Sequence, residues 1–206
     1  MRILITAGPT REYVDPVRFL SNASSGRIGC ALAAAAKAAG HTVSLVFGPA
    51  AIEPPPVDEL VRVTSAADMF EAVLARFDGC DVFIAAAAVC DYRPVCRKER
   101  KIKKTEGKVT LDLERTADIL AHMSKRRHRQ VVVGFCLETE NLERRARDKL
   151  EVKQLDFVVA NGPRAIDADR QDALILSSQG LREPLKGVTK QELAERILTA
   201  VTQRGR

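Results

Sequence analysis

Short apolar runs alternate with helix-forming segments along most of this chain, and this alternation limits the folds open to it. Strands are expected at 2–8, 42–48, 61–65, 81–89, 130–138, 156–161 and 172–178. Helices are expected at 28–40, 66–79, 117–127, 141–154 and 189–204, the last opening on a Thr189–Glu192 capping box. The pattern is typical of an α/β, Rossmann-like fold, with a doubly wound, mainly parallel sheet and helices on both faces. We expect a single domain over 1–206.

Composition narrows the kind of partner. The net charge is +6 and the pI is near 9.2, which favours anionic ligands such as nucleotides and phosphates. Aromatic residues make up 4% and tryptophan is absent, so few side chains are suited to stacking single-stranded bases. We expect no nucleic acid and no membrane partner, since no apolar run approaches the roughly 20 residues of a membrane span. Five scattered cysteines without a C-x-x-C pair fit reduced thiols and a cytoplasmic location.

The first long loop, "VRFLSNASSGRIG" at 17–29, is longer than an ordinary strand-to-helix connection. Ser24, Ser25 and Gly26 come directly before a helix, where free backbone N–H groups bind phosphate or carboxylate. The alternative is that a serine only caps the helix and the glycine serves close contact. The length of the loop and the polar Asn22 favour a binding site. Gly8 lies in "TAGPTRE" (6–12), a turn after the first strand.

Two further stretches follow the expected central strand. "AAAAVCDYRP" (85–94) ends that strand in small residues, which leave room for a flat base or ribose, and Asp91 would accept from an amine or hydroxyl. The alternative is that the small residues form a tightly packed strand and that Asp91 only caps its end. The charged segment 91–115 breaks the alternation, and we expect a flexible flap leading into a β-arm. Its "RKERKIKK" (97–104) is either a solvated face or a clamp for a triphosphate.

The remaining candidates are cations, while the usual nucleophile sets are missing. Phe135 lies near the carboxyl end of an expected strand. Lys149 and Lys153 are four residues apart on one expected helix, and they either reach over the carboxyl ends of the strands, where ligands bind in such sheets, or form a solvated face. "KRRHR" (125–129) is expected to be the solvated end of a helix. No Ser-His-Asp set, no G-x-S-x-G motif and no metal-ligating cluster is evident. Chemistry carried by cations and backbone amides indicates phosphoryl or nucleotidyl transfer.

The combination of "ITAGPTREYVDPVRFLSNASSGRIG", "AAAAVCDYRP", "KIKK" and "VVGFCLET" resembles the bacterial phosphopantothenoylcysteine synthetases (phosphopantothenate–cysteine ligases) of coenzyme A biosynthesis. The similarity covers nearly the whole chain. It implies that the carboxylate of 4′-phosphopantothenate attacks the α-phosphate of CTP, giving an acyl-cytidylate and pyrophosphate, and that cysteine then displaces CMP. Mg²⁺ would bind together with the triphosphate, and no dedicated cluster of side chains would hold it. The resemblance also implies a homodimer formed partly through the arm near 107–115, and a decarboxylase as a possible partner.

The resemblance also assigns roles to residues. Asn22 matches an asparagine that holds the acyl-cytidylate carbonyl, Arg18 an arginine needed for activity, and Lys101 a flap lysine tied to the second step. The loop residues Gly8, Ser24, Ser25 and Gly26 would receive the phosphate or acyl-nucleotide, and Arg18 and Asn22 are expected to face the reacting carboxylate. The positions that match the nucleotide site are Ala87, Ala88, Asp91, Lys101, Ala117, Asp118, Ile119, Leu120, Phe135, Lys149 and Lys153.

The chain departs from the family pattern in one place that bears on the nucleotide pocket. "TADI" (116–119) stands where relatives have N-P-D-I, so Thr116 and Ala117 are expected to alter that pocket. CTP is favoured over ATP because the motifs resemble the bacterial branch. Three alternatives remain: a short-chain NAD(P)-dependent oxidoreductase, a nucleic-acid-binding domain that uses 97–104 and 125–129, and a scaffold that has lost activity. The first lacks its glycine fingerprint and its Tyr-x-x-x-Lys pair.

Overall fold

A twisted eight-stranded sheet forms the centre of the protein in the computed structural model, which describes residues 1–104, 106–166 and 168–203. The strand order is β12-β11-β10-β9-β6-β1-β4-β5. In chain order the strands are β1 (Arg2–Ala7), β4 (Thr42–Phe47), β5 (Glu59–Arg62), β6 (Val82–Ala85), β9 (Val131–Leu137), β10 (Phe157–Asn161), β11 (Arg170–Ser177) and β12 (Arg182–Thr189). All neighbours from β5 to β10 pair in parallel, and β11 and β12 continue the sheet antiparallel. The predicted mainly parallel sheet is confirmed.

The strand order reverses at β1, which has β4 on one side and β6 on the other. The chain leaves β1 toward β4 and β5, then crosses back to β6, β9 and β10 on the far side. The loops that follow β1 and β6 therefore diverge at one point of the sheet edge. In open α/β sheets this is the place where ligands bind.

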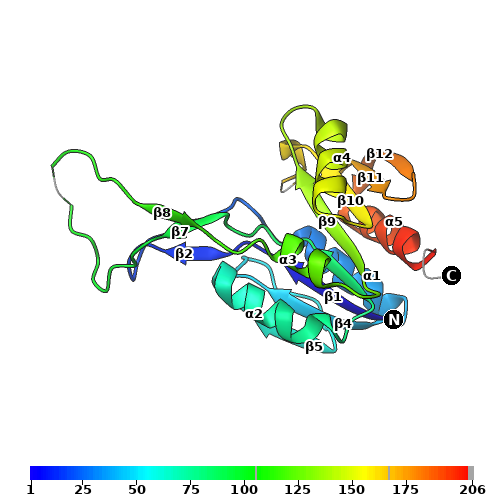
Figure 1. Ribbon diagram of the computed structural model, residues 1–206, viewed down its shortest axis with the longest axis horizontal. Helices are drawn as coiled ribbons and strands as arrows, with labels where there is room; N and C mark the ends of the chain where they lie inside the picture. The colour runs from blue at the N-terminus through cyan, green and yellow to red at the C-terminus, as the bar shows by residue number, and fades with distance from the viewer. Residues whose placement is uncertain (105, 167, 204–206) are drawn as a thin grey trace.

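Helices cover both faces of the sheet (Figure 1). They are α1 (Arg27–Ala38), α2 (Ala66–Phe77), α3 (Ile119–Arg126), α4 (Leu142–Val152) and α5 (Lys190–Gln203), with a short 3-10 turn at Pro163–Ala165. The apolar sides of α1 and α5 contact one face, and those of α2, α3 and α4 contact the other. Phe47 on the first side and Phe77 and Phe83 on the second are almost fully buried. Burial of each such side chain contributes about 1.5–3 kcal/mol.

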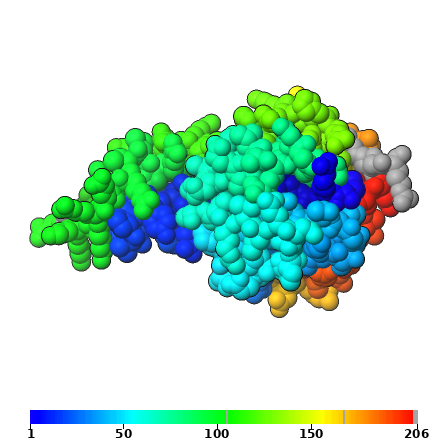
Figure 2. Space-filling model, turned by 90° about the horizontal axis from the view of Figure 1, so that it is seen from below, coloured from blue at the N-terminus to red at the C-terminus, as the bar shows by residue number. Residues whose placement is uncertain are grey.

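A hairpin and an arm project from this body. The hairpin pairs β2 (Arg11–Tyr13) with β3 (Phe19–Ser21), and the arm pairs β7 (Tyr92–Pro94) with β8 (Leu113–Arg115). Figure 1 shows the connection between β7 and β8 at the far tip, returning beside the turn of the hairpin. Figure 2 shows the arm and the hairpin side by side, away from the rounded body. The predicted β-arm is present, but the pairing is confined to its base, and 108–112 are not in a strand. Thr105 lies outside the described residues.

Some predicted boundaries were wrong. The third strand was expected at 61–65 and lies at Glu59–Arg62. The helix expected from 117 begins at Ile119, because the Asp118 side chain caps it by accepting from the Ala121 N–H at 2.9 Å. The strands β2, β3 and β12 were not predicted, and β2 and β3 occupy part of what was read as loop. The Thr189–Glu192 capping box is confirmed by two reciprocal hydrogen bonds of 2.7 and 3.1 Å.

The central strand was expected over 81–89, but β6 ends at Ala85. Its pairing with β9 stops at the Ala85–Gly134 register pair, while the chain continues beside 8–10 through single contacts such as Ala88 N–H to Gly8 O at 3.0 Å. The carbonyls of Ala88 and Val89 accept from a side chain, and the Ala88 carbonyl also accepts from the Thr10 N–H at 3.2 Å in an isolated bridge outside the named strands. The small residues therefore leave the sheet here and open a gap on the β9 side.

Candidate functional site

Asn22 fixes the course of the small-residue run after β6. Its Nδ2 donates to the Ala88 carbonyl at 3.1 Å and to the Val89 carbonyl at 3.0 Å. On the opposite side, the Thr6 hydroxyl accepts from the Ala87 N–H at 3.3 Å. The predicted asparagine is thus tied to the predicted alanines, and all of them lie at the edge where β1 and β6 end.

A cavity of about 480 Å³ opens between this run and the helices α3 and α4. We call it the α3–α4 cavity. It contains nine of the predicted nucleotide positions: Ala87, Asp91, Ala117, Asp118, Ile119, Leu120, Phe135, Lys149 and Lys153. Thr6, Ala85, Val89, Tyr92, Arg115 and Thr116 complete its lining. The structure therefore gathers residues that are far apart in the sequence into one hollow.

A second cavity, of about 430 Å³, lies on the other side of the same run and faces the start of α1. We call it the α1 cavity. Its lining includes the first-loop residues Asn22, Ala23, Ser24, Ser25 and Gly26, with Ala88 behind them. Residues 86–89 thus form a wall between two hollows.

The two cavities adjoin each other. Both are lined by Ala87, Val89, Asp91, Phe135 and Lys149. Small side chains in the dividing wall leave space for one extended molecule, or for two molecules that meet. The site therefore has room for one extended ligand or for two ligands that meet.

Lysines supply positive charge to both hollows. Lys149 Nζ lies 2.5 Å from the Phe135 carbonyl oxygen, and burial, together with the nearby Lys153, lowers the pKa of its ammonium group. Lys153 pairs with Asp118 at 2.7 Å. Burial acts to raise the pKa of Asp118, but the hydrogen bonds from Lys153 and from the Ala121 N–H outweigh it, so the pKa is lowered. A partly desolvated ammonium group is well placed to attract a phosphate.

The start of α1 faces the α1 cavity with its backbone N–H groups. Gly26 is the N-cap residue, with φ of 76°, and no side chain caps the helix. The possibility that Ser24 or Ser25 serves only as a cap is therefore wrong. Gly29 faces β1, where an added Cβ would lie 2.2 Å from the Ala7 Cβ. The glycine lets the helix start sit directly over the strand end, which is the arrangement that receives anions.

Gly8 has a supporting position. A Cβ on Gly26 would lie 3.3 Å from the Gly8 Cα, so the two backbones pass close to each other. Among the described residues that line the two cavities, Gly8 does not appear. Gly8 lies directly beneath Gly26, whereas Ser24, Ser25 and Gly26 line the α1 cavity.

Arg18 and Lys101 lie elsewhere. Arg18 forms an ion pair with Asp15 at 3.1 Å and donates from its guanidinium to the Ile102 carbonyl. Lys101, the residue before Ile102, is exposed on the connection between β7 and β8. In the described part of the chain neither side chain lines the α1 or the α3–α4 cavity. The expectation that Arg18 and Asn22 both face one reacting group is therefore not met in this chain, since Arg18 is turned to the flap.

Thr116 and Ala117 lie at the rim of the α3–α4 cavity. The Thr116 hydroxyl donates to the Cys90 carbonyl at 2.5 Å, and its N–H donates to the Asp91 carbonyl at 2.9 Å. These bonds join the end of the arm to the small-residue run. The departure from the family pattern thus keeps the strand end and the arm together.

Several lining residues of the α1 cavity were missed from the sequence. They are Arg27, Ile28, Leu137, Asn161, Ala165, Ile166 and Lys190. Lys190 Nζ donates to the Ala165 carbonyl at 2.7 Å and to Gln171 Oε1 at 2.6 Å. Asn161 ends β10, and its place at the end of an expected strand (156–161) was the available signal. Lys190 gave none, because the start of α5 was read only for its capping box.

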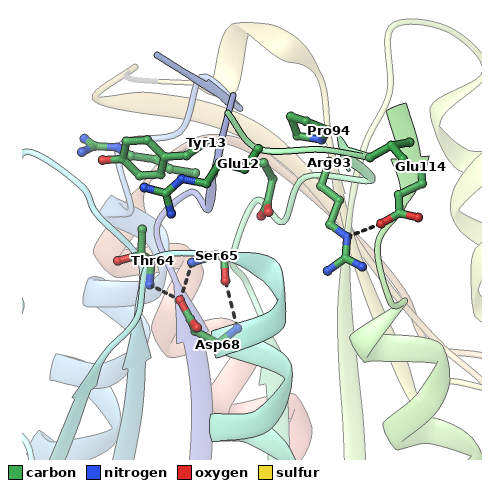
Figure 3. A pocket seen from close by; sticks show the side chains of 11 residues that line it. Glu12, Tyr13, Thr64, Ser65, Asp68, Arg93, Pro94 and Glu114 are labelled. Atoms are coloured by element: carbon green, nitrogen blue, oxygen red, sulfur yellow. Dashed lines mark hydrogen bonds and ion pairs between the residues drawn. The ribbon is translucent and has the colours of Figure 1, made fainter. Parts of the chain in front are cut away.

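A third cavity, of about 560 Å³, lies between the hairpin, the start of α2 and the arm (Figure 3). Its polar groups are largely engaged with one another. Arg93 pairs with Glu114 at 2.8 Å, and Asp68 accepts from the Ser65 N–H at 2.9 Å. The buried Glu12 accepts from the Ala66 N–H at 2.7 Å. The Glu12 bond joins the hairpin to α2, and this cavity lies apart from the wall formed by residues 86–89.

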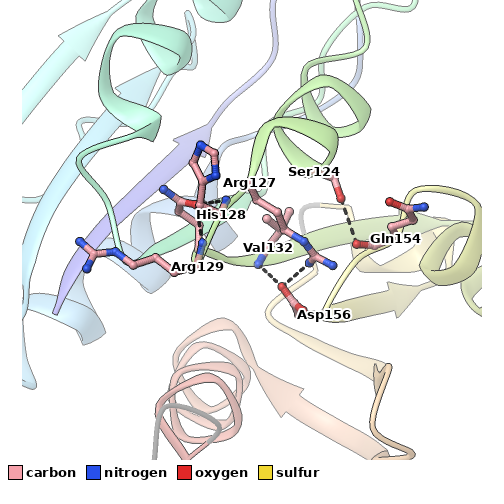
Figure 4. Close-up of polar contacts among 8 residues, drawn as sticks. Ser124, Arg127, His128, Arg129, Val132, Gln154 and Asp156 are labelled. Carbon is pink, nitrogen blue, oxygen red and sulfur yellow. Dashed lines mark hydrogen bonds and ion pairs between the residues drawn. The ribbon is translucent and has the colours of Figure 1, made fainter.

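A buried carboxylate, that of Asp156, lies at the amino ends of the strands, opposite the two cavities. Asp156, which directly precedes β10, accepts from Arg127 at 2.7 Å and from the N–H of Val132, the second residue of β9, at 2.6 Å (Figure 4). The run 125–129 was expected to be solvated, and Arg127 departs from this expectation because it reaches back to that carboxylate. This cluster supports the fold at the amino ends of the strands.

The described residues hold neither a metal-ligand cluster nor a membrane-spanning helix. Over residues 1–104, 106–166 and 168–203, the structure contains no group of three or more His, Cys, Asp or Glu side chains suited to a metal ion. Within the same described ranges, no helix has the length and apolar character needed to cross a bilayer.

Comparison with known proteins agrees with this geometry. Residues 1–204 match the family described as DNA/pantothenate metabolism flavoprotein C-terminal domain. The coenzyme A biosynthesis bifunctional protein CoaBC of Bacillus subtilis is 42% identical over 204 residues, which cover 97% of this chain and 50% of that protein. CoaBC of Escherichia coli K12 is 46% identical over 165 residues, which cover 78% of this chain and 41% of that protein. The chain thus spans about half the length of these curated relatives.

Solved structures give the same result. The crystal structure of a CoaBC C-terminal domain is 40% identical, with a TM-score of 0.86 over 98% of this chain and 94% of that chain. The DNA/pantothenate metabolism flavoprotein from Streptococcus pneumoniae is 26% identical, with a TM-score of 0.87 over 99% of both chains. From its sequence, its doubly wound sheet and these relatives, the chain belongs to the DNA/pantothenate metabolism flavoprotein C-terminal domain family.

Proposed function

We propose that this protein is a phosphopantothenate–cysteine ligase of coenzyme A biosynthesis that uses CTP. The reaction joins 4′-phosphopantothenate to cysteine and gives 4′-phospho-N-pantothenoylcysteine, CMP and pyrophosphate. Relatives named as coenzyme A biosynthesis bifunctional proteins support the pathway. The chemistry of the site supports the reaction class.

One observation carries the proposal: two cavities share a wall of small residues at the sheet edge. An acid must be activated by a nucleotide, so the two must meet. The α3–α4 cavity offers a flat, partly apolar space beside Phe135, with Asp91, Lys149 and Lys153 around it. The α1 cavity offers a helix start and the Asn22 amide. We assign CTP to the first and the acid to the second.

The first step needs charge stabilisation more than a base. A carboxylate oxygen of 4′-phosphopantothenate attacks the α-phosphorus of CTP, the bond to the β-phosphate oxygen breaks, and pyrophosphate leaves with that electron pair. The positive charges of Lys149 and Lys153 lie where phosphates would approach, and Asp91 would accept from an amine or hydroxyl of the nucleotide. Oriented cations of this kind stabilise the developing negative charge without moving.

The second step forms the amide. The cysteine amine attacks the acyl carbon, the bond from that carbon to the cytidylate oxygen breaks, CMP leaves, and the nitrogen gives up a proton. Asn22 Nδ2 donates its two N–H groups to the Ala88 and Val89 carbonyls, and we propose that one of them turns to the acyl carbonyl when the intermediate is bound, because the side chain is exposed at the α1 cavity. Lys101 would act from the flap, and Arg18 from the hairpin turn that holds the flap.

Mg²⁺ is expected to accompany the triphosphate. This ion prefers oxygen ligands and commonly uses one or two carboxylates together with phosphate oxygens. Asp91 lines both cavities and fits that requirement, whereas Asp118 is engaged by Lys153. When bound, the ion would neutralise charge on the triphosphate.

We also propose a homodimer. Exposed apolar side chains gather on the hairpin and on the arm: Val17, Phe19, Tyr92, Val95, Val109, Leu111 and Leu113. A projecting segment of this composition favours contact with a second copy. Light scattering should give twice the 22.6 kDa chain mass, and a monomer mass would refute the proposal. A decarboxylase acting on the product is the other proposed partner, because the relatives are bifunctional proteins of about twice the length. Co-purification with such an enzyme would test it.

The test is pyrophosphate release with 4′-phosphopantothenate and Mg²⁺, comparing CTP with ATP and with or without cysteine. We expect release that requires both 4′-phosphopantothenate and CTP, and CMP turnover that requires cysteine. Asn22→Asp places an oxygen against the two carbonyls that now receive N–H groups, so we expect a loss of about 100-fold, typical of one lost carbonyl-stabilising donor.

Asn141→Asp is the matched control. Asn141 is exposed, precedes α4 and lines neither of the two cavities, and aspartate tolerates its left-handed conformation. This variant should react like the wild type. Absence of pyrophosphate release with either nucleotide would refute the proposed ligase, and release with ATP alone would refute the choice of CTP.

A further inference from the structure

The segment before residue 105 is attached to the turn of the hairpin. Lys98 N–H donates to the Val14 carbonyl at 2.9 Å, and the Arg97 guanidinium lies 5.1 Å from the centre of the Tyr13 ring. Farther along, the peptide groups of Ile102 return to the same turn. The flap is therefore joined to a defined surface of the body over residues 97–102.

Asp15 is the centre of this attachment. It is fully buried, and both of its carboxylate oxygens accept hydrogen bonds. One oxygen accepts from the Val17 N–H at 2.8 Å and the Arg18 N–H at 2.9 Å. The other accepts from the Ile102 N–H at 3.0 Å and lies 3.1 Å from Arg18 Nε. A single carboxylate thus joins two segments that are 87 residues apart.

Arg18 holds the same peptide from its other side. Its guanidinium donates to the Ile102 carbonyl while it pairs with Asp15. The N–H and the C=O of Ile102 are therefore both taken up by the hairpin turn. Since Lys101 directly precedes Ile102 in the chain, its backbone position follows from that of Ile102.

We propose that Asp15 is a positioning residue for the ligase reaction, holding Arg18 and the Lys101 segment as one unit. Arg18 and Lys101 are two of the expected catalytic residues, and neither lines a cavity in the described part of the chain; one buried carboxylate connects Arg18 to the segment that carries Lys101. The catalytic part of this inference rests on the proposed function. The attachment itself does not.

Asp15→Asn tests the attachment with little change of shape. Both oxygens accept from N–H groups, so an amide in either orientation sets its own NH₂ against donors and loses one side. Hydrogen–deuterium exchange read by mass spectrometry on peptides covering 97–104 should be at least tenfold faster than in the wild type. Exchange at the wild-type rate would overturn the proposal.

Asp81→Asn is the matched control. Asp81 also accepts a backbone N–H on one oxygen and a guanidinium on the other, both from Arg2, but it lies at the amino end of β6. It should leave exchange in 97–104 unchanged. Ile102→Pro is the second variant in case Asp15→Asn does not fold, because it removes one donor and leaves the Asp15 bonds to 17 and 18 intact. It should also speed exchange in the flap.

Kinetics separate positioning from a merely structural role. A displacement of about 1 Å in a positioned group costs about 100-fold in rate, so kcat for cysteine-dependent CMP formation should fall about 10- to 100-fold in Asp15→Asn. The KM for CTP should change less than threefold, since the described lining of the α3–α4 cavity, with Lys149, Lys153 and Asp118, includes no residue of the hairpin. Faster exchange with unchanged kcat would overturn the positioning role. If the wild type shows no ligase reaction, the proposed function fails, and exchange still decides whether Asp15 holds the flap.

Discussion

Gly29→Ala should both destabilise the protein and impair its site. An added Cβ at Gly29 would lie 2.2 Å from the Ala7 Cβ and 3.0 Å from the Ala7 Cα. Ordinary contact begins near 3.4 Å, so α1 and β1 must separate by about 1.2 Å at this point. Neither neighbour is a flexible side chain, so the backbone has to move. Overpacking of this kind costs about 1–3 kcal/mol.

The assay has two readouts. In a chain of this length each kcal/mol lowers Tm by about 2–4 °C, so thermal unfolding should show a fall of about 2–12 °C. The start of α1, which lines the α1 cavity, moves with the helix, and pyrophosphate release should therefore fall at temperatures where the variant is folded.

Two controls define the cause. Gly79→Ala adds the same methyl group where the nearest atom, the Arg76 carbonyl oxygen, is 3.4 Å away, and it should change Tm little. Ala7→Gly in the Gly29→Ala background removes the 2.2 Å contact and should restore part of the stability. A Gly29→Ala protein with wild-type Tm and wild-type turnover would refute the argument from close contact.

Three further results are expected. Lys149→Met should lower the affinity for CTP at least tenfold in calorimetry, which is the scale of a lost hydrogen bond to a charged group. It should not lower Tm, because it removes a cation whose pKa is lowered by burial, and a large fall in Tm would contradict this. Arg127→Gln should destabilise the fold by roughly 1–3 kcal/mol in urea unfolding and leave turnover intact, since it weakens the hydrogen bonding of the buried Asp156 away from the site. Arg182 and Arg147 hold the pKa of Glu143 at about 2, so the stabilising effect of this carboxylate is complete above about pH 4.5 and is lost as the pH falls toward 2. The difference in Tm between the wild type and Glu143→Gln should therefore shrink between pH 4.5 and pH 2. A constant difference would contradict the pairing.

The sheet and its helices were predictable because buried strands and amphipathic helices carry strong periodic signals. β12 was missed because it is an edge strand with Pro184 and several exposed polar residues, so it lacks an apolar run. The run 86–89 was read as strand because it is apolar. It leaves the sheet where the Asn22 side chain, 66 residues from Ala88, donates to the carbonyls of Ala88 and Val89. A contact between residues so far apart in the chain cannot be predicted from the local sequence pattern.

The site was predictable in part for the same reason. Residues at strand ends, such as Phe135, and cations four apart, such as Lys149 and Lys153, come together at the expected edge. Lys190 was missed because its place depends on how α5 crosses the sheet. Arg18 was expected at the reacting group, and only the structure shows that it holds the Ile102 peptide. The roles taken from resemblance stay predictions until they are measured.

The most direct test of the proposed reaction follows an oxygen atom. With ¹⁸O in the carboxylate of 4′-phosphopantothenate, attack on the α-phosphorus of CTP followed by displacement by cysteine should place one ¹⁸O in CMP per turnover and none in pyrophosphate. Mass spectrometry of the two products after complete turnover gives the answer. Label in inorganic phosphate with release of CDP, or turnover without label in CMP, would contradict an acyl-cytidylate formed across the shared wall of the two cavities.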